Sequence, residues 1–138
     1  MDYLTSAIKV AASGLNAEST RLRVTSENIA NASSTAEIPG GDPYQRKLVS
    51  FGSELDRISN ATEVQIQSIQ DDPTAFPVEY NPSHPAADAE GFVKMPNVNV
   101  LIEMADMRDA NRSYQANLQV LKQARELISM TIEMMRGR

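Results

Sequence analysis

The chain has 138 residues, a net charge of -5 and no cysteine. This length suits a single domain, and the lack of cysteine excludes disulfides and thiolate chemistry. The acidic excess argues against a nucleic-acid-binding surface, because phosphate binding needs clustered Lys and Arg. Aromatic residues make up only 5% of the chain and tryptophan is absent, so we expect a core with few large side chains.

All seven prolines lie between Pro39 and Pro96. Because proline inside a helix costs about 3 kcal/mol, this distribution predicts helices at both ends and extended structure between them. We therefore expect a mainly α fold with a β-rich insert, in which long N- and C-terminal helices pack as a coiled-coil-like pair. The predicted parts are residues 1–34, 35–96 and 97–138.

The start of the chain has neither the charged region nor the unbroken apolar run of a secretory signal. We expect no cleaved signal and no membrane anchor. A heptad row of apolar residues instead predicts a coiled-coil helix over about residues 3–32. The row consists of Ile8, Leu15, Leu22 and Ile29.

Asn28 and Asn31 lie near the end of this predicted helix, although asparagine is a mediocre helix former. A buried amide in a coiled seam fixes register and partner choice. Asparagines that face solvent or cap a helix are the alternative, and the residues alone favour neither reading. The same question applies to Asn111 and Asn117 in the last segment.

The middle segment shows partial alternation of apolar and polar residues over residues 44–51 and 62–69. These stretches are bounded by turn sequences, so they predict two strands. The following stretch is rich in proline, and we expect a loop there with a short hairpin around residues 91–95.

No catalytic or metal-binding set is evident. His84 is the only histidine, and a base or ligand needs partners that the chain does not supply. The acidic pairs in the middle segment precede proline or glycine, which is ordinary turn chemistry; they are Asp71 with Asp72, and Asp88 with Glu90. We expect no cofactor, no metal and no enzymatic activity.

The last segment repeats the helical pattern more strongly, with apolar residues at steps of three and four. Asn97 is the expected N-cap, and Gly137 lies where the helix should end. The apolar row consists of Leu101, Met104, Tyr114, Leu118, Leu121, Ile128, Ile132 and Met135. The two terminal helices should pack against each other and leave apolar stripes for other subunits.

The stretch ASGLNAESTRLRVTSENIANASST resembles the N-terminal signature of bacterial flagellar axial proteins, the rod and hook subunits. Their common element is the run Asn-Ile-Ala-Asn at residues 28–31. The blocks GGDPYQRKLVSF, NPSHPAADAEGFVKMPNVN and EMADMRDANRSYQANLQVLKQARELI resemble the proximal rod proteins. The separation between Thr35 and Tyr44 is longer than in many axial proteins, where a Thr-Pro-Gly-Tyr element follows the run closely.

The resemblance implies a structural subunit of the proximal rod, the drive shaft that carries torque from the motor ring to the hook. It implies export without processing through the flagellar type III apparatus, and a location in the periplasm. The implied partners are copies of the chain, other rod proteins, and the ring and export-gate side and the distal rod side of the basal body. Nucleic acid and stable membrane insertion are not implied.

The expected subunit contacts combine the helix rows with the asparagines: Ile8, Leu15, Leu22, Asn28, Ile29, Asn31, Leu101, Met104, Asn111, Tyr114, Asn117, Leu118, Leu121, Ile128 and Ile132. Two other classes of function stay open. An export chaperone or adaptor would also be acidic, helical and free of cysteine. A cell-wall hydrolase would have to use the scattered carboxylates.

Overall fold

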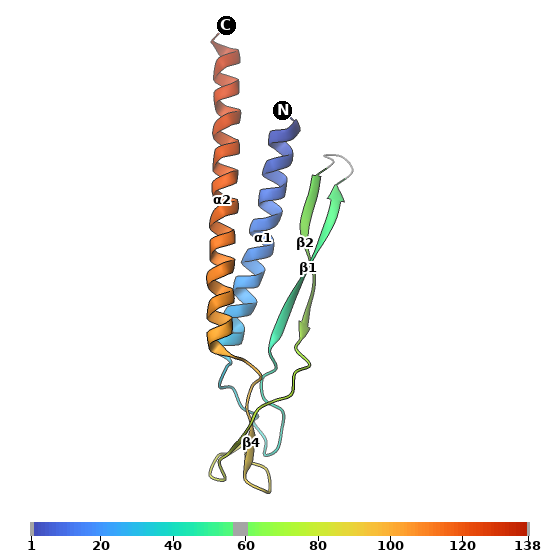
Figure 1. Ribbon diagram of the computed structural model, residues 1–138, viewed down its shortest axis with the longest axis vertical. Helices are drawn as coiled ribbons and strands as arrows, with labels where there is room; N and C mark the ends of the chain where they lie inside the picture. The colour runs from blue at the N-terminus through green and yellow to red at the C-terminus, as the bar shows by residue number, and fades with distance from the viewer. Residues whose placement is uncertain (1, 57–60, 138) are drawn as a thin grey trace.

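The computed structural model describes residues 2–56 and 61–137. Two long helices dominate it, α1 (Asp2–Ala30) and α2 (Val100–Arg136). They lie side by side and run in opposite directions, so both ends of the chain lie at the same end of the helix pair (Figure 1). We call the opposite end, where α1 ends at Ala30 and α2 begins at Val100, the foot of the helix pair.

The residues between the helices form two antiparallel hairpins. The long one joins β1 (Lys47–Asp56) to β2 (Ala61–Asp71), and the short one joins β3 (Val78–Tyr80) to β4 (Phe92–Lys94). The predicted fold, a terminal helix pair with a central β-hairpin region, is confirmed. Strand β2 extends the predicted segment 62–69 at both ends, whereas β1 begins three residues later than the predicted segment 44–51 and ends five residues later. The short hairpin includes the expected segment around Phe92.

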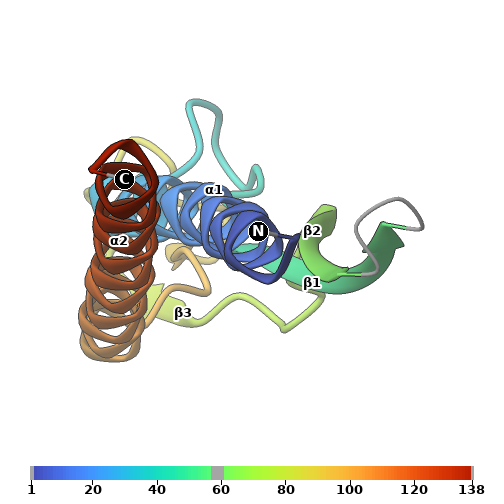
Figure 2. The ribbon, with the colours of Figure 1, turned by 90° about the horizontal axis from the view of Figure 1, so that it is seen from above.

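Helix α1 lies between two partners. The view along the helices shows α2 on one side of α1 and the β1–β2 hairpin on the other (Figure 2). The hairpin is fastened to α1 by a hydrogen bond of 3.1 Å from the Val64 N–H to the Ser13 hydroxyl. An ion pair of 2.8 Å joins Lys9 to Asp56. Because α1 is covered on two sides, one apolar row cannot account for its packing.

Small side chains fill the contacts of α1. Its buried apolar residues are Ala11, Ala17 and Val24, whereas the predicted row of Ile8, Leu15, Leu22 and Ile29 is only half-buried. The helices are close at Gly14, where an added methyl group would lie 2.7 Å from the amide nitrogen of Asn117. The helices therefore pack closely where glycine and alanine allow it.

A row that mixes small, polar and large apolar residues marks the side of α2 that is covered. Its members follow steps of four and three, the period of a coiled coil, and each is buried or half-buried: Glu103, Met107, Ala110, Tyr114, Asn117, Leu121, Ala124 and Ile128. Four members of the predicted apolar row of α2 coincide with this side or border it, namely Tyr114, Leu118, Leu121 and Ile128. The other members, Leu101, Met104, Ile132 and Met135, are exposed.

The ends of α2 differ in one respect from the expectation. The N-cap is Asn99, whose side chain accepts hydrogen bonds from the N–H groups of Leu101 and Ile102. The prediction of Asn97 as the cap is wrong by two residues, because Asn97 is used to hold the loops at the foot. Gly137 caps the C-terminal end as predicted.

Neither described helix is apolar enough over a sufficient length to cross a membrane.

Candidate functional site

The amide of Asn28 is the centre of a buried polar cluster at the foot of the helix pair. Its nitrogen donates to the Lys47 carbonyl at 2.9 Å and to the Glu103 carboxylate at 3.0 Å. Its oxygen accepts from the Tyr44 hydroxyl and from the Lys47 N–H, both at 2.9 Å. All four hydrogen-bonding positions of the amide are therefore used within the chain.

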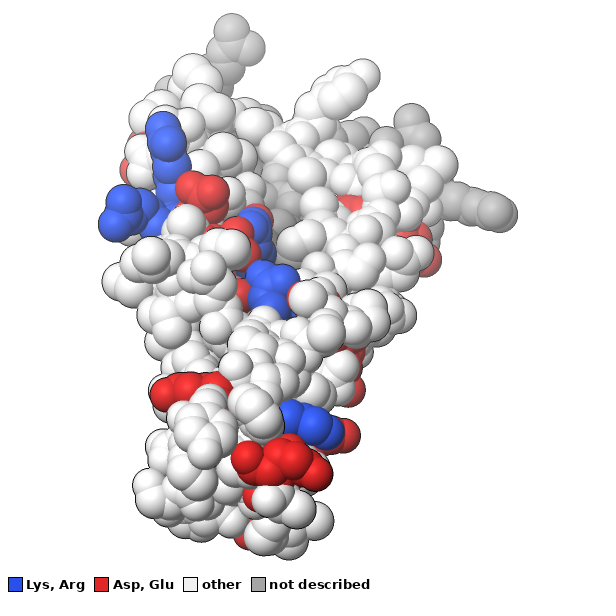
Figure 3. All heavy atoms as spheres, turned by 60° about the horizontal axis from the view of Figure 1, so that its bottom comes forward, with Lys and Arg blue, Asp and Glu red and all other residues white. Residues whose placement is uncertain are grey.

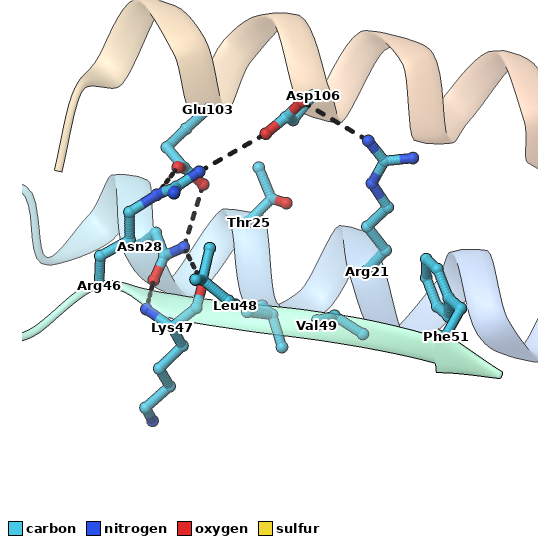
Figure 4. A pocket seen from close by; sticks show the side chains of 11 residues that line it. Arg21, Thr25, Asn28, Arg46, Lys47, Leu48, Val49, Phe51, Glu103 and Asp106 are labelled. Atoms are coloured by element: carbon cyan, nitrogen blue, oxygen red, sulfur yellow. Dashed lines mark hydrogen bonds and ion pairs between the residues drawn. The ribbon is translucent and has the colours of Figure 1, made fainter. Parts of the chain in front are cut away.

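Arg46 supplies the positive charge of the cluster. Its guanidinium bonds Glu103 at 2.6 Å and lies 3.7 Å from Asp106 (Figure 4). It also bonds Asp72 at 3.2 Å. Glu103 is only 1% exposed, and a buried carboxylate is tolerated only when it is paired and hydrogen-bonded. Arg46 and Asn28 together provide those partners from the two sides of the carboxylate.

Asn97 joins the loops to the cluster. Its oxygen accepts from the Arg46 N–H at 2.8 Å, and its nitrogen donates to the carbonyls of Asp72 and Thr74 at 3.1 and 2.9 Å. We define the foot cluster as the six residues Asn28, Tyr44, Arg46, Asp72, Asn97 and Glu103. It connects the end of α1, the entry to β1, the exit from β2 and the start of α2.

The surroundings shift the pKa values of Tyr44, Arg46 and Asp72 in the foot cluster. Burial raises the pKa of the Tyr44 phenol, and the charge of Glu27 adds to this, so Tyr44 stays a donor. Burial opposes the charge of Arg46, but its hydrogen bonds to Glu103 and Asp72 outweigh that effect and raise its pKa. The hydroxyl and N–H of Thr74, together with Arg46, lower the pKa of Asp72 despite its desolvation.

A cleft of about 320 Å³ lies beside the foot cluster between α1, β1 and α2. Its charged groups pair with one another: Arg21 lies 3.5 Å from Asp106 and 3.8 Å from Glu18. Within residues 2–56 and 61–137, no group of three or more His, Cys, Asp or Glu side chains is placed to hold a metal ion. The arrangement is suited to joining segments of the chain. One buried carboxylate oxygen of Glu18, next to the cleft, has no hydrogen-bond partner among the described residues.

The other polar residues considered in the sequence take part in turns. Asp88 accepts hydrogen bonds from the N–H groups of Glu90 and Phe92. The ring nitrogen Nδ1 of His84 accepts from the Ala86 N–H.

Acidic side chains gather over the loop region at the lower end of the molecule (Figure 3), so this face does not present the cluster of Lys and Arg that binding to nucleic-acid phosphates requires.

The four asparagines singled out in the helices have different environments. Asn28 is buried inside the chain, although it was expected at a contact between subunits. Asn31 bonds the Glu27 carbonyl and the Ser34 hydroxyl at the end of α1. Asn117 packs against Gly14, and Asn111 is exposed. Asn28 and Asn117 thus make contacts within the chain, and of the four only Asn111 is open to solvent.

Sequence reasoning did not identify Arg46, Asp72 or Glu103 as one cluster. The signal was present for Glu103, which continues the seam of α2 to its N-terminal end at the coiled-coil step. A carboxylate at a seam position calls for a buried partner, and that requirement points to a cation elsewhere in the chain. The identity of the cation depends on how the loops fold.

Two family models match the chain at its ends. The family described as flagella basal body rod protein matches residues 8–36. The C-terminal family of the flagellar basal body rod FlgEFG proteins matches residues 89–134. Asn28 and Glu103 lie in these two matched ranges, whereas Tyr44, Arg46 and Asp72 lie between them. The foot cluster therefore ties the matched ends to the part of the chain that neither model covers.

Individual relatives match over nearly the whole chain. The flagellar basal-body rod protein FlgC of Agrobacterium fabrum is 59% identical over 137 residues, which are 99% of each chain. The FlgC proteins of Yersinia enterocolitica and Salmonella typhimurium are 41% and 39% identical over 123 residues, 89% of this chain and 91% of each relative. Given 59% identity to one member over nearly the full length, the chain belongs to the FlgC family of flagellar basal-body rod proteins, which are structural subunits and not enzymes.

Proposed function

We propose that this chain builds the proximal rod by assembling helically with copies of itself and with other rod proteins. In this role it carries torque from the motor ring toward the hook and surrounds the export channel. It reaches the periplasm through the flagellar type III apparatus without a cleaved signal. Its neighbours along the axis are the ring and export-gate side and the distal rod side of the basal body.

The observation that supports this proposal is the apolar surface that α2 leaves uncovered. Leu101 is 78% exposed and Met134 70% exposed, and many other large apolar side chains of α2 are also open to solvent. Exposed apolar surface of this extent is typical of a protein that is completed by neighbours. Among the predicted contact residues, Leu101, Met104, Asn111 and Ile132 are the ones most open to other subunits.

The remaining predicted contact residues support assembly indirectly. Tyr114, Asn117, Leu121 and Ile128 lie along the seam with α1, so they keep the two helices in register. Leu118 borders that seam. A substitution at these positions should disturb the packing of α1 against α2 and affect contacts with other subunits only as a consequence. A substitution at the exposed contact residues should affect those contacts directly.

The test is complementation of a bacterium from which its own flgC gene has been deleted. The wild-type chain should restore swimming and be present in purified basal bodies. Leu127→Asp changes a residue of α2 that is 50% exposed and should abolish swimming while leaving expression and helical content unchanged. Gln123→Asp, at an exposed polar position of the same helix, is the matched control and should swim.

Two outcomes would overturn the proposal. If basal bodies purified from swimming cells lack the chain, it is not a rod subunit. Retention of the chain in the cytoplasm in a fixed ratio to an export substrate would instead support an adaptor.

A further inference from the structure

The short β3–β4 hairpin lies beyond the foot of the helix pair, at the lower end of the molecule in Figure 1. Its strands pair Tyr80 with Phe92 and Val78 with Lys94. Because successive side chains of a strand point to opposite sides of a sheet, these four share one side of the hairpin, whereas Val93 lies on the other. Val93 is only 2% exposed. The hairpin therefore packs against the chain through one side and turns the other side outward.

The outward side of the hairpin is rich in apolar surface. Val78, Tyr80 and Phe92 are 59%, 66% and 43% exposed, and we call these three residues the tip face. The rings of Tyr80 and Phe92 meet edge to face, with 5.3 Å between their centroids. The Tyr80 ring also lies against Gly91, where an added Cβ would be 3.1 Å from a ring carbon. The rings are thus held in place before any partner arrives, which lowers the cost of binding.

Acidic side chains border the tip face. Asp42 pairs at 2.7 Å with Lys94, which shares the outward side of the hairpin. At the other border, Glu90 is exposed two residues before Phe92, and Asp88 accepts a hydrogen bond from the Phe92 N–H. Figure 3 shows acidic side chains gathered over this end of the molecule. Lys94 is the one basic residue in the sequence of residues 35–43 and 74–98, whereas the acidic ones are Glu37, Asp42, Glu79, Asp88 and Glu90.

From these features we propose that the tip face is a docking surface for a basic segment of another protein, in which an Arg or Lys side chain lies beside an apolar one. Aromatic rings attract cations over their faces, and carboxylates form strong hydrogen bonds with Arg and Lys. The apolar neighbour would cover Val78 and the edges of the two rings. Aromatic anchors bordered by charged residues are typical of protein–protein contacts.

The charge of the region favours this partner over the alternatives. Two tip faces carry charge of the same sign, and like charges brought together oppose association. Anionic lipid headgroups and nucleic-acid phosphates are repelled for the same reason. The inference rests on the proposed function, because the expected partner is a neighbouring protein of the basal body. The contact is separate from those of the terminal helices, since the hairpin lies beyond the foot.

The contact can be tested by photo-cross-linking from within the tip face. The variant Tyr80→p-benzoylphenylalanine keeps an aromatic ring next to Phe92 and adds a photoreactive group. It is produced in a bacterium that lacks its own flgC gene. Irradiation of purified basal bodies should join position 80 to a peptide of another basal-body protein, and mass spectrometry should find Arg or Lys beside the joined residue.

Three control variants test the chemistry of the contact. Glu79→p-benzoylphenylalanine places the same group on the opposite side of β3 and should not join the same peptide. Adding Glu90→Lys to the position-80 variant should lower the yield of the adduct by roughly threefold or more, because an attractive charge pair becomes a repulsive one. Adding Glu54→Lys, at an exposed position of β1, should leave the yield unchanged.

The inference is overturned if basal bodies contain the position-80 variant but yield no adduct. An adduct with a second copy of the chain or with a glycan would replace the partner proposed here, and a yield that Glu90→Lys leaves unchanged would remove the role of charge. None of these results affects the proposed rod function, which fails only if the chain is absent from purified basal bodies. That absence would overturn both.

Discussion

The side-chain amide of Asn28 donates a hydrogen bond of 3.0 Å to the carboxylate of Glu103, across 75 residues of sequence. Both side chains are only 1% exposed. The bond joins the end of α1 to the first turn of α2, where a carboxylate also interacts favourably with the helix dipole. Asn28 belongs to the Asn-Ile-Ala-Asn run, which was expected to contact other subunits. At Asn28 the run joins two helices of the same chain.

Replacing Asn28 should destabilise the fold strongly. Asn28→Ala removes the partner of the Lys47 N–H, the Lys47 carbonyl and the Tyr44 hydroxyl, and leaves Glu103 with Arg46 alone. Each orphaned buried group costs about 1–3 kcal/mol. Asn28→Asp keeps the size of the side chain but faces Glu103 with a second carboxylate, so it should be at least as damaging. The free energy of unfolding in urea measures both. Asn111→Ala, at an exposed position, should stay within about 0.5 kcal/mol of wild type; equal stability of Asn28→Ala and Asn111→Ala would contradict the role given to Asn28.

The pair between Arg46 and Glu103 should show strong coupling. Arg46→Met removes the cation from a buried carboxylate, a change that typically costs about 3–5 kcal/mol. Glu103→Gln removes the charge that needs the cation, so the double variant should be more stable than the sum of the single losses predicts. Urea denaturation of the four proteins gives the coupling energy, and simple additivity would show that the two side chains act independently.

Stability should fall in acid in a way that depends on Asp72. Its pKa is lowered in the folded chain by Thr74 and Arg46. The stabilisation is therefore fully present above the unfolded-state pKa, near 3.9, and is lost as the pH falls through the lower folded-state value. Melting temperatures between pH 7 and pH 2 should show a shallower acid decline in Asp72→Asn than in wild type. Asp109→Asn, at an exposed position of α2, is the matched control, and an identical decline in all three proteins would exclude this source of acid sensitivity.

Hydrogen exchange in the dilute monomer should be uneven along the helix pair. The foot is held by the foot cluster. Toward the other end, the helices pack through small side chains such as Ala11, and residues 130–136 of α2 are exposed or half-buried. Amides around Asn28 and Glu103 should therefore exchange more slowly than those of residues 3–8 and 130–136. Assembly into the rod should slow the second group. Uniform protection in the monomer would mean that the helix pair is complete without neighbours.

The proline distribution and the apolar period were sufficient to predict the helix pair and the hairpin region. These signals are local, because proline acts on its own backbone and an apolar period reflects one helix. Which side of α1 is buried could not be predicted, since the hairpin covers a second side and small residues such as Gly14 provide the closest contact. Asn97 was predicted as the cap of α2, and Asn99 takes that place, because the loop contacts that occupy Asn97 arise only in the folded chain.

The position of Glu103 in the sequence also limits when the fold can close. A chain that is synthesised or threaded from its N-terminus presents Asn28, Tyr44 and Arg46 long before the residue that joins them. Until Glu103 follows, Arg46 and Asn28 have no common partner, and α1 has no second helix to pack against. If the chain is delivered from its N-terminus, the contacts of Asn28 and Arg46 with Glu103 form last. The foot of the helix pair is then complete only once α2 has arrived.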